Sequence, residues 1–401
     1  MNLVRKWGLD WLPCWAHLLQ LPIDFSLYNK KVIFKLNSMT FSLCIFIQCS
    51  WNVFKPLLKK VQELLNKFAH SVLAKAELSK WSTKALVFSV PTRWFSALAS
   101  IQRLQDILEE NGAAFIKVKE TMMWTKMKDY DPEEEDEDYL IFTQEELLMM
   151  RKFVDFFTEF STKSDIIGGE TYSNIQMVFP YTIELFEHIT GFIEDPLIGE
   201  FAQNFLGKFS EYFNFIVDPL YTGVKYTFQP LYITTAFLSP VFYNGLNEDH
   251  KEAAKMFILQ ELQKLEEMQT PATPARPVPR KSVSLPKLKH FSKMMDASAK
   301  NSASSSSSLL ERKLKKDLEA FQMDCESKLE EIQAATNTEE LMLEDPATYW
   351  LINDGKYLSK LPVLARALLS SPPSSVPSER LFSVASLLSS GKFISFQSYI
   401  F

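Results

Sequence analysis

The sequence predicts a mainly α-helical protein, and three observations support that fold class. Apolar residues recur at spacings of three and four over long stretches, as expected when one face of a helix is buried. Helix-start signals precede several of these stretches, and the clearest is Thr143 with Glu146 three residues later, the pattern of a capping box. Hydrophobic residues make up 46% of the 401 residues, so the helices have enough apolar surface to bury a large core.

The composition limits the function classes. The formal net charge of -6 gives no overall sign of a nucleic-acid binder. The four cysteines are too few and too scattered for a disulfide scaffold, which favours a reducing compartment. Cys44 and Cys49 have no histidine pair near them, so no zinc finger is visible, and we expect no bound metal or cofactor. We also expect no membrane and no small-molecule substrate among the partners.

The N-terminal part contains a pair of residues that could ligate a metal. Cys14 and His17 stand in a C-x2-H pattern followed by leucines, but two ligands fall short of the four that a structural zinc needs. A core pair at a helix start is the plainer interpretation. Residues 24–50 are apolar and β-branched over much of their length, and a buried strand or core helix is the plain interpretation of this stretch.

The central part is predicted to be helical from residue 51 to residue 269. One long amphipathic helix is expected from Val53 to Ala76. A short β-like run before Pro91 is expected to lead into a second helix, with Thr92 as its N-cap. Arg93 and Trp94 follow, and they admit two interpretations: a packed indole beside a solvated cation, or a guanidinium on phosphate with an indole stacked on a base.

Further helices are expected after an acidic run at 131–138, which reads as a solvated loop. The capping box at Thr143 begins one, a Phe-rich helix covers Phe201 to Val217, and a core helix follows in the segment that ends near Ser239. Residues 270–308 are rich in proline, serine and basic residues and are predicted to form a linker. This linker is either a soluble spacer or a segment for nuclear import or phosphate contact. A connecting helix at 309–340 comes next.

The C-terminal part carries the most distinctive pattern. An apolar stripe is predicted to lie on one helix that ends at Pro372, and its members include Trp350, Tyr357, Leu361, Leu364 and Leu368. The stretch PPSSVPSERLFS then predicts a new helix, because proline suits the first turn and serine suits the N-cap. Glu379 lies in that first turn, where a carboxylate is favoured, and Leu381 and Phe382 lie on the predicted buried face.

Three motifs together resemble the hAT-superfamily transposases and the host proteins derived from them, many of which carry BED-type zinc fingers. They are the C-x2-H pair with its leucines, TRWFS, and W-x6-Y-x3-L-x2-L followed by SSVPSERLFS. The resemblance implies an RNase H-like core interrupted by a long helical insertion, with Glu379 as the last of three metal-binding acids that in the family use Mg or Mn. It also implies that Arg93 and Trp94 lie near DNA and that the C-terminal region mediates dimerisation.

The resemblance further implies a domain order. Residues 1–23 would be a remnant of the RNase H-like core, 24–50 an irregular insertion or a gene-model artefact such as translated intron, 51–269 the helical insertion, 341–390 the dimerisation region and 391–401 an irregular tail. Only Glu379 matches the catalytic acids, so it is interpreted as vestigial and the chain as no enzyme. We expect a nuclear protein that acts as a homo-oligomer, with DNA as a further partner class. The alternative is a helical scaffold or truncated gene product with no DNA role.

Overall fold

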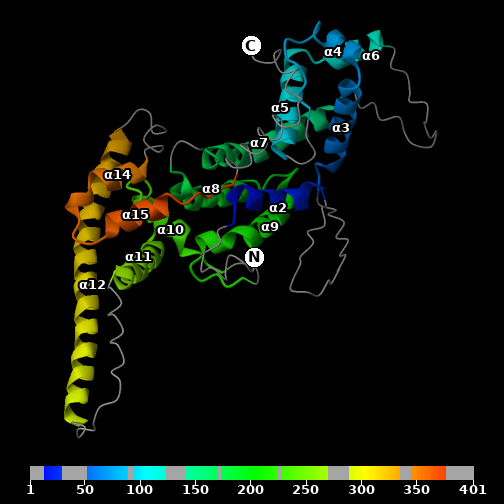
Figure 1. Cartoon of the computed structure of the whole chain (residues 1–401). Coiled ribbons are helices and arrows are strands. Elements are labelled where there is room, and N and C mark those ends of the chain that lie inside the picture. The colour runs from blue at the N-terminus through cyan, green and yellow to red at the C-terminus, as the bar shows by residue number, and fades with distance from the viewer. Residues whose placement is uncertain are drawn as a thin grey trace, which may run out of the picture. The chain divides into compact units, whose positions relative to one another are not determined.

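A computed structural model of the chain describes residues 13–28, 52–88, 94–122, 141–169, 173–223, 227–269, 289–334 and 345–375 (Figure 1). Every regular element in these ranges is a helix, and the β pairing within them is one isolated bridge between Thr222 and Thr227. The prediction of a mainly α-helical protein is therefore confirmed. A sheet of the RNase H type is not among these described elements. None of the described helices is both long enough and apolar enough to cross a bilayer.

Contacts within the chain divide it into two units. Unit 1 comprises Met1–Ile166 and Ile183–Phe213, and unit 2 comprises Ile167–Thr182 and Asn214–Phe401. The predicted helical domain at 51–269 therefore contributes to both units. This division has no signal in the sequence, because it falls inside continuous helices that have no linker composition: α7 (Gln144–Ile167), α8 (Val178–Gly191) and α9 (Gly199–Val217).

Unit 1 contains α2 (Trp15–Tyr28), α3 (Lys55–Ala69), α4 (Val72–Leu78), α5 (Trp94–Glu110) and α6 (Ala114–Thr121). It also holds nearly all of α7 (Gln144–Ile167), together with the later part of α8 (Val178–Gly191) and most of α9 (Gly199–Val217). Phenylalanine rings from α7 and α9 form its core. The rings of Phe156 and Phe205 lie 5.3 Å apart in an edge-to-face contact. Along α9 the core rings recur every four residues, at Phe201, Phe205, Phe209 and Phe213.

The capping box predicted at Thr143 is present at the start of α7. The Thr143 amide donates to the Glu146 carboxylate at 2.7 Å, and the Glu146 amide donates to the Thr143 hydroxyl at 3.2 Å. The Lys60 ammonium of α3 donates to both oxygens of the Glu146 carboxylate, at 2.7 and 2.8 Å. A local start signal thus also joins two helices of unit 1.

Two predictions in the first part of the chain are wrong, and one predicted boundary is misplaced. The expected single helix from Val53 to Ala76 is two helices, α3 and α4, because the Ser71 hydroxyl accepts from the Ala74 amide and starts a new helix there. The expected β-like run before Pro91 is no strand in its described part, residues 85–88. The boundary placed at residue 24 falls inside α2, where Ile23 and Leu27 are both buried. The first residues of the supposed insertion therefore belong to a core helix, and residues 29–50 lie outside the described ranges.

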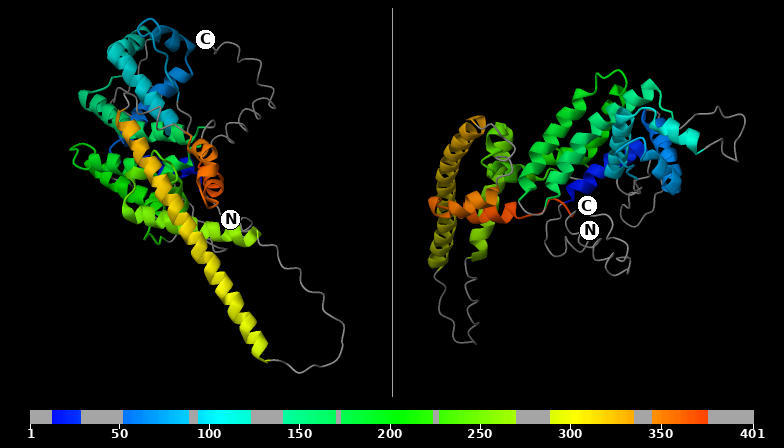
Figure 2. Two further views of the ribbon diagram at one scale, coloured as in Figure 1. Left: turned by 90° about the vertical axis from the view of Figure 1, so that its left-hand side faces the viewer. Right: turned by 90° about the horizontal axis from the view of Figure 1, so that it is seen from above.

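Unit 2 contains the short 3₁₀ helix η1 (Ile175–Met177), α10 (Pro230–Phe237), η2 (Tyr243–Gly245), α11 (Glu248–Gln269) and α12 (Lys289–Ala334). It ends in α14 (Pro346–Ile352), η3 (Asp354–Lys356) and α15 (Leu361–Leu369). As predicted, α10 is a core helix with six consecutive buried residues, and it packs on α11 and α15. Figures 1 and 2 show the later part of α12 beside α14 and α15.

The linker predicted at 270–308 differs from the structure over its second half. The helix α12 begins at Lys289 and runs without a break to Ala334, so the serine run at 304–308 lies within it. Serine has a modest helix propensity and does not break a helix as proline does, and Pro286 is the last proline before α12. The predicted connecting helix is thus the second half of a much longer one.

Candidate functional site

The candidate site is the surface formed where the C-terminal segment packs on α12. Along α12 the buried residues are Leu310, Leu314, Asp317, Phe321 and Cys325, at spacings of four, three, four and four. Four of them are apolar or weakly polar, which is expected of a helix face turned toward a core. Asp317 is the exception, since it is only 2% exposed.

Asp317 holds the chain between η3 and α15. One carboxylate oxygen accepts from the Leu358 amide and the other from the Ser359 amide, each at 2.7 Å. These two amides precede α15, where no helix bond can satisfy them. The acid therefore supplies the acceptors for two backbone donors that would otherwise be left without partners.

Trp350 anchors the same segment from the other side. Its side chain is fully buried, and its indole N–H donates to the Leu238 carbonyl at the end of α10 at 2.7 Å. Its ring lies 4.9 Å from that of Phe321 on α12 and 5.0 Å from that of Tyr357. An indole that is buried on all sides and hydrogen-bonded fixes both the position and the rotation of α14.

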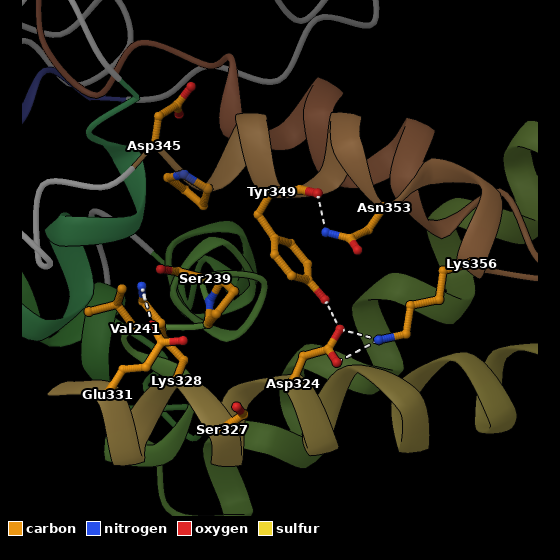
Figure 3. Close-up of a pocket in the computed structure, with 12 residues that line it drawn as sticks. Ser239, Val241, Asp324, Ser327, Lys328, Glu331, Asp345, Tyr349, Asn353 and Lys356 are labelled. Atoms are coloured by element: carbon orange, nitrogen blue, oxygen red, sulfur yellow. Dashed lines mark hydrogen bonds and ion pairs between the residues drawn. The ribbon is translucent and has the colours of Figure 1, made fainter. Parts of the chain in front are cut away.

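A polar cavity of about 340 Å³ opens between α12 and α14 (Figure 3). In it the Asp324 carboxylate accepts from the Tyr349 hydroxyl at 2.5 Å, and the Lys356 ammonium lies 2.5 Å from both of its oxygens. The Tyr349 hydroxyl is also 2.6 Å from the Tyr357 hydroxyl. Because a carboxylate only accepts, Tyr349 donates to Asp324 and in turn accepts from Tyr357.

The acid–base properties of this network favour a structural role. Burial, with the hydrogen bond to Asp324, raises the pKa of Tyr349 far above its usual value. Burial likewise raises the pKa of Tyr357 and that of the Cys325 thiol. Phenols and a thiol with raised pKa values stay protonated at neutral pH and are poor bases or nucleophiles.

The remaining charged groups of the cavity are also engaged. Lys328 pairs with Glu331 at 2.9 Å, and the Asp345 carboxylate caps α14 by accepting from the Ala347 amide at 3.1 Å. Ser239 lines the cavity and is almost fully buried. The cavity thus brings together groups that hold α14 and η3 on α12, and they present no unpaired charge of one sign to a ligand.

The solvent-facing part of this segment carries apolar side chains as well as the exposed Asp354 and Lys356. Four large side chains are exposed there, and together we call them the apolar face: Leu351 at 63%, Ile352 at 76%, Leu358 at 59% and Val363 at 49%. They come from the end of α14, the loop that Asp317 holds and the start of α15. Exposed apolar side chains are typical of protein interaction sites where they form one contiguous surface.

The predicted dimerisation residues lie on the inward side instead. Trp350, Tyr357, Leu361 and Leu364 are buried within unit 2, and Leu368 is half-buried. The predicted single helix that carries them is also wrong, because Trp350 lies on α14, Tyr357 follows η3, and the leucines lie on α15. The break follows from Gly355 in η3 and from Pro362, which stands in the first turn of α15. The stripe is a core stripe, and it leaves the apolar face as the accessible part of the segment.

Other predicted site residues belong to unit 1 or lie outside the described ranges. Cys14 is half-buried just before α2 and His17 is exposed on α2, in unit 1. Trp94 begins α5, while Arg93 lies outside the described residues. Glu379, Leu381 and Phe382 also lie outside them, so their roles stay predictions.

Sequence reasoning missed Asp317, Asp324 and Tyr349. For Asp317 a signal existed, since an acid in the middle of an apolar stripe at helical spacing requires a buried partner. For the contact between Asp324 and Tyr349 there was none, because the two residues lie on different helices and 25 positions apart.

Among the residues that the structure describes, no three or more His, Cys, Asp or Glu side chains are grouped so that they could hold a metal ion. No family model matches the chain, and no curated protein matches it at a significant level.

Proposed function

We propose that this chain is a hAT-transposase-derived protein that acts in the nucleus through self-association and does not carry out strand transfer. The sequence motifs support the family, and Glu379 is the only one of the family's three metal-binding acids that these motifs contain. Since two-metal chemistry needs all three carboxylates to place both ions, one acid cannot assemble that centre.

The apolar face is the observation that carries self-association. The C-terminal segment is held rigidly from behind by Asp317, Trp350 and the Asp324 network, and its outer side exposes Leu351 and Ile352 most fully. A rigid apolar surface loses little conformational entropy on binding, which makes it a better interface than a mobile one. Removal of this surface from water by a second copy would give a stable association.

The oligomeric state of the full chain tests this proposal. In sedimentation equilibrium at about 500 mM NaCl, where contacts between exposed charges are screened, we expect a dimer, and the variant Leu351→Glu/Ile352→Glu is expected to be monomeric at the same concentration and salt. Leu220→Glu is the matched control, because Leu220 is an exposed leucine of the same unit at 87% exposure but lies outside the apolar face. A wild-type monomer, or a dimer that survives the double change, would refute the role of this face.

The absence of strand transfer is tested separately. Purified chain with Mg or Mn is expected to leave DNA duplexes with transposon-like ends uncleaved and unjoined. Cleavage that is lost on Glu379→Gln would show that the acid is functional and that our interpretation of it as vestigial is wrong.

A further inference from the structure

A second solvent-facing surface of unit 2 has an ordered pattern of charge. On α12 one row of residues at spacings of three and four lies opposite the buried stripe, and we call it the outer row: Leu309, Arg312, Lys316, Glu319, Met323, Glu326 and Glu330. All seven side chains are exposed, and Leu309 and Met323 are 53% and 70% exposed. Two large apolar side chains thus stand exposed in a row of charges.

The charges in the outer row are separated by sign. Arg312 and Lys316 stand in its first part, and Glu319, Glu326 and Glu330 in its second. This order is opposite to the one that a helix dipole favours, and α12 has no acid in its first turn and no base in its last. The separation of charge therefore does not stabilise the helix on its own.

The charged groups of the outer row are also available. No residue in the described part of the chain pairs with Arg312, Lys316, Glu319 or Glu330, and Glu326 accepts one hydrogen bond from Gln322, one turn before it on the same helix. Their charges are therefore not neutralised by the part of unit 2 that the structure describes.

We propose that the outer row pairs with the outer row of a second copy of this chain, with the two α12 helices antiparallel. In an antiparallel pair centred on Phe321, Arg312 stands opposite Glu330 of the second copy, and Lys316 stands opposite Glu326. The two-fold symmetry repeats both contacts, so four ion pairs form from two kinds of contact. A parallel pair would set like charges against one another and is excluded by the same reasoning.

The same alignment accounts for the two apolar side chains. Met323 stands opposite Glu319 beside the two-fold axis, where its exposed thioether packs against the methylene groups of the acid. Leu309 stands opposite Gln333, near the ends of the paired segment. The contact is therefore mainly electrostatic, with little apolar burial, and we expect it to be weakened strongly by salt.

This inference rests on the proposed self-association but assigns it a second surface, and salt separates the two. An association through the apolar face persists at high salt, whereas the α12 contact is lost. We would measure the dissociation constant of the full chain by sedimentation equilibrium at about 50 mM and 500 mM NaCl, a range over which the Debye length falls severalfold. We expect the constant to rise at least tenfold with salt.

Charge reversal gives the decisive test. Arg312→Glu/Lys316→Glu and Glu326→Lys/Glu330→Lys are each expected to raise the dissociation constant at low salt at least tenfold. An equimolar mixture of these two variants is expected to associate as well as wild type, since every opposed pair is then again of opposite sign. Lys59→Glu/Lys117→Glu changes the net charge as the first variant does, at exposed positions of unit 1, and is expected to have no effect.

Three outcomes would overturn the inference. In the first, neither reversal weakens the dimer while Leu351→Glu/Ile352→Glu abolishes it, so that the apolar face is the whole interface. In the second, the mixture fails to recover, which means that the reversals act by perturbing the fold. In the third, wild type is monomeric at low salt and only Arg312→Glu/Lys316→Glu loses binding to duplex DNA, so that the basic half serves a polyanion.

Discussion

Replacement of Asp317 by alanine is expected to destabilise unit 2 and loosen the loop that carries Leu358. The carboxylate is buried and accepts from the Leu358 and Ser359 amides at 2.7 Å each. Alanine leaves both backbone donors without an acceptor while α12 itself keeps its helix propensity. The perturbation therefore acts on the contact between α12 and the C-terminal segment.

The size of the effect follows from the number of donors left without partners. A buried donor that loses its partner costs about 1–3 kcal/mol, so two such donors cost about 2–6 kcal/mol. Removal of a buried charge offsets part of this, which favours the lower half of that range. Asp317→Asn keeps one carbonyl acceptor but brings its own NH₂ toward the second amide, so a loss of about 1–3 kcal/mol is expected.

Hydrogen exchange and urea unfolding measure the two consequences. In Asp317→Ala the amides of Leu358 and Ser359 are expected to exchange faster than in wild type, and the urea midpoint of unit 2 is expected to fall. Lys313→Ala is the matched control, because Lys313 lies one turn earlier on α12 with its side chain exposed. If Asp317→Ala keeps the protection of both amides and unfolds like the control, the reasoning from these hydrogen bonds is refuted.

Three more predictions concern other contacts of the fold. Lys60→Met should cost unit 1 about 1–3 kcal/mol in urea unfolding, because Glu146 loses a largely buried partner at 2.7 Å, and an unchanged midpoint would show that the pair contributes nothing. Phe205→Ala should cost about 3–5 kcal/mol by the cavity it opens among the rings of α7 and α9, and a loss below 1 kcal/mol would indicate that the core collapses into the space. Burial lowers the pKa of His250 below 6.5, so the unfolded chain binds a proton at a higher pH than the folded chain does. The folded state therefore loses stability as the pH falls through 6.5. Glutamine at this position can still donate to the Val217 carbonyl but does not titrate. The melting temperature of His250→Gln should therefore fall less than that of wild type between about pH 7.5 and pH 5.5, and equal falls would contradict this assignment.

Local signals predicted part of the fold well. The capping box at Thr143 was readable because both of its partners lie within four residues. The Phe-rich helix and the core helix after it follow from apolar content and period alone. The break between α3 and α4 was missed because the apolar period continues across Ser71, so the choice depends on a cap that competes with helix continuation.

The candidate site was harder to predict. The sequence showed which C-terminal residues are apolar, but the same stripe suits a dimer interface and a core, and only packing on α12 decides between them. Trp350 illustrates this, since its partners Leu238 and Phe321 lie far from it in sequence. The apolar face was missed because its four members follow no helical period, as they come from two helices and the loop between them.

The regular spacing of the phenylalanines on α9 affects how precisely the position of this helix along its axis is determined within unit 1. A shift of α9 by four residues, about 6 Å along its axis, would place each ring close to where its neighbour had been. Contacts among these apolar rings alone therefore discriminate poorly between alignments of α9 that differ by four residues. The polar turn before α9 selects the alignment. There the Asp195 carboxylate accepts from the Leu197 and Ile198 amides, and it also accepts from the Lys152 ammonium of α7 at 2.6 Å. One carboxylate at the edge thus selects among alignments that the interior would accept almost equally.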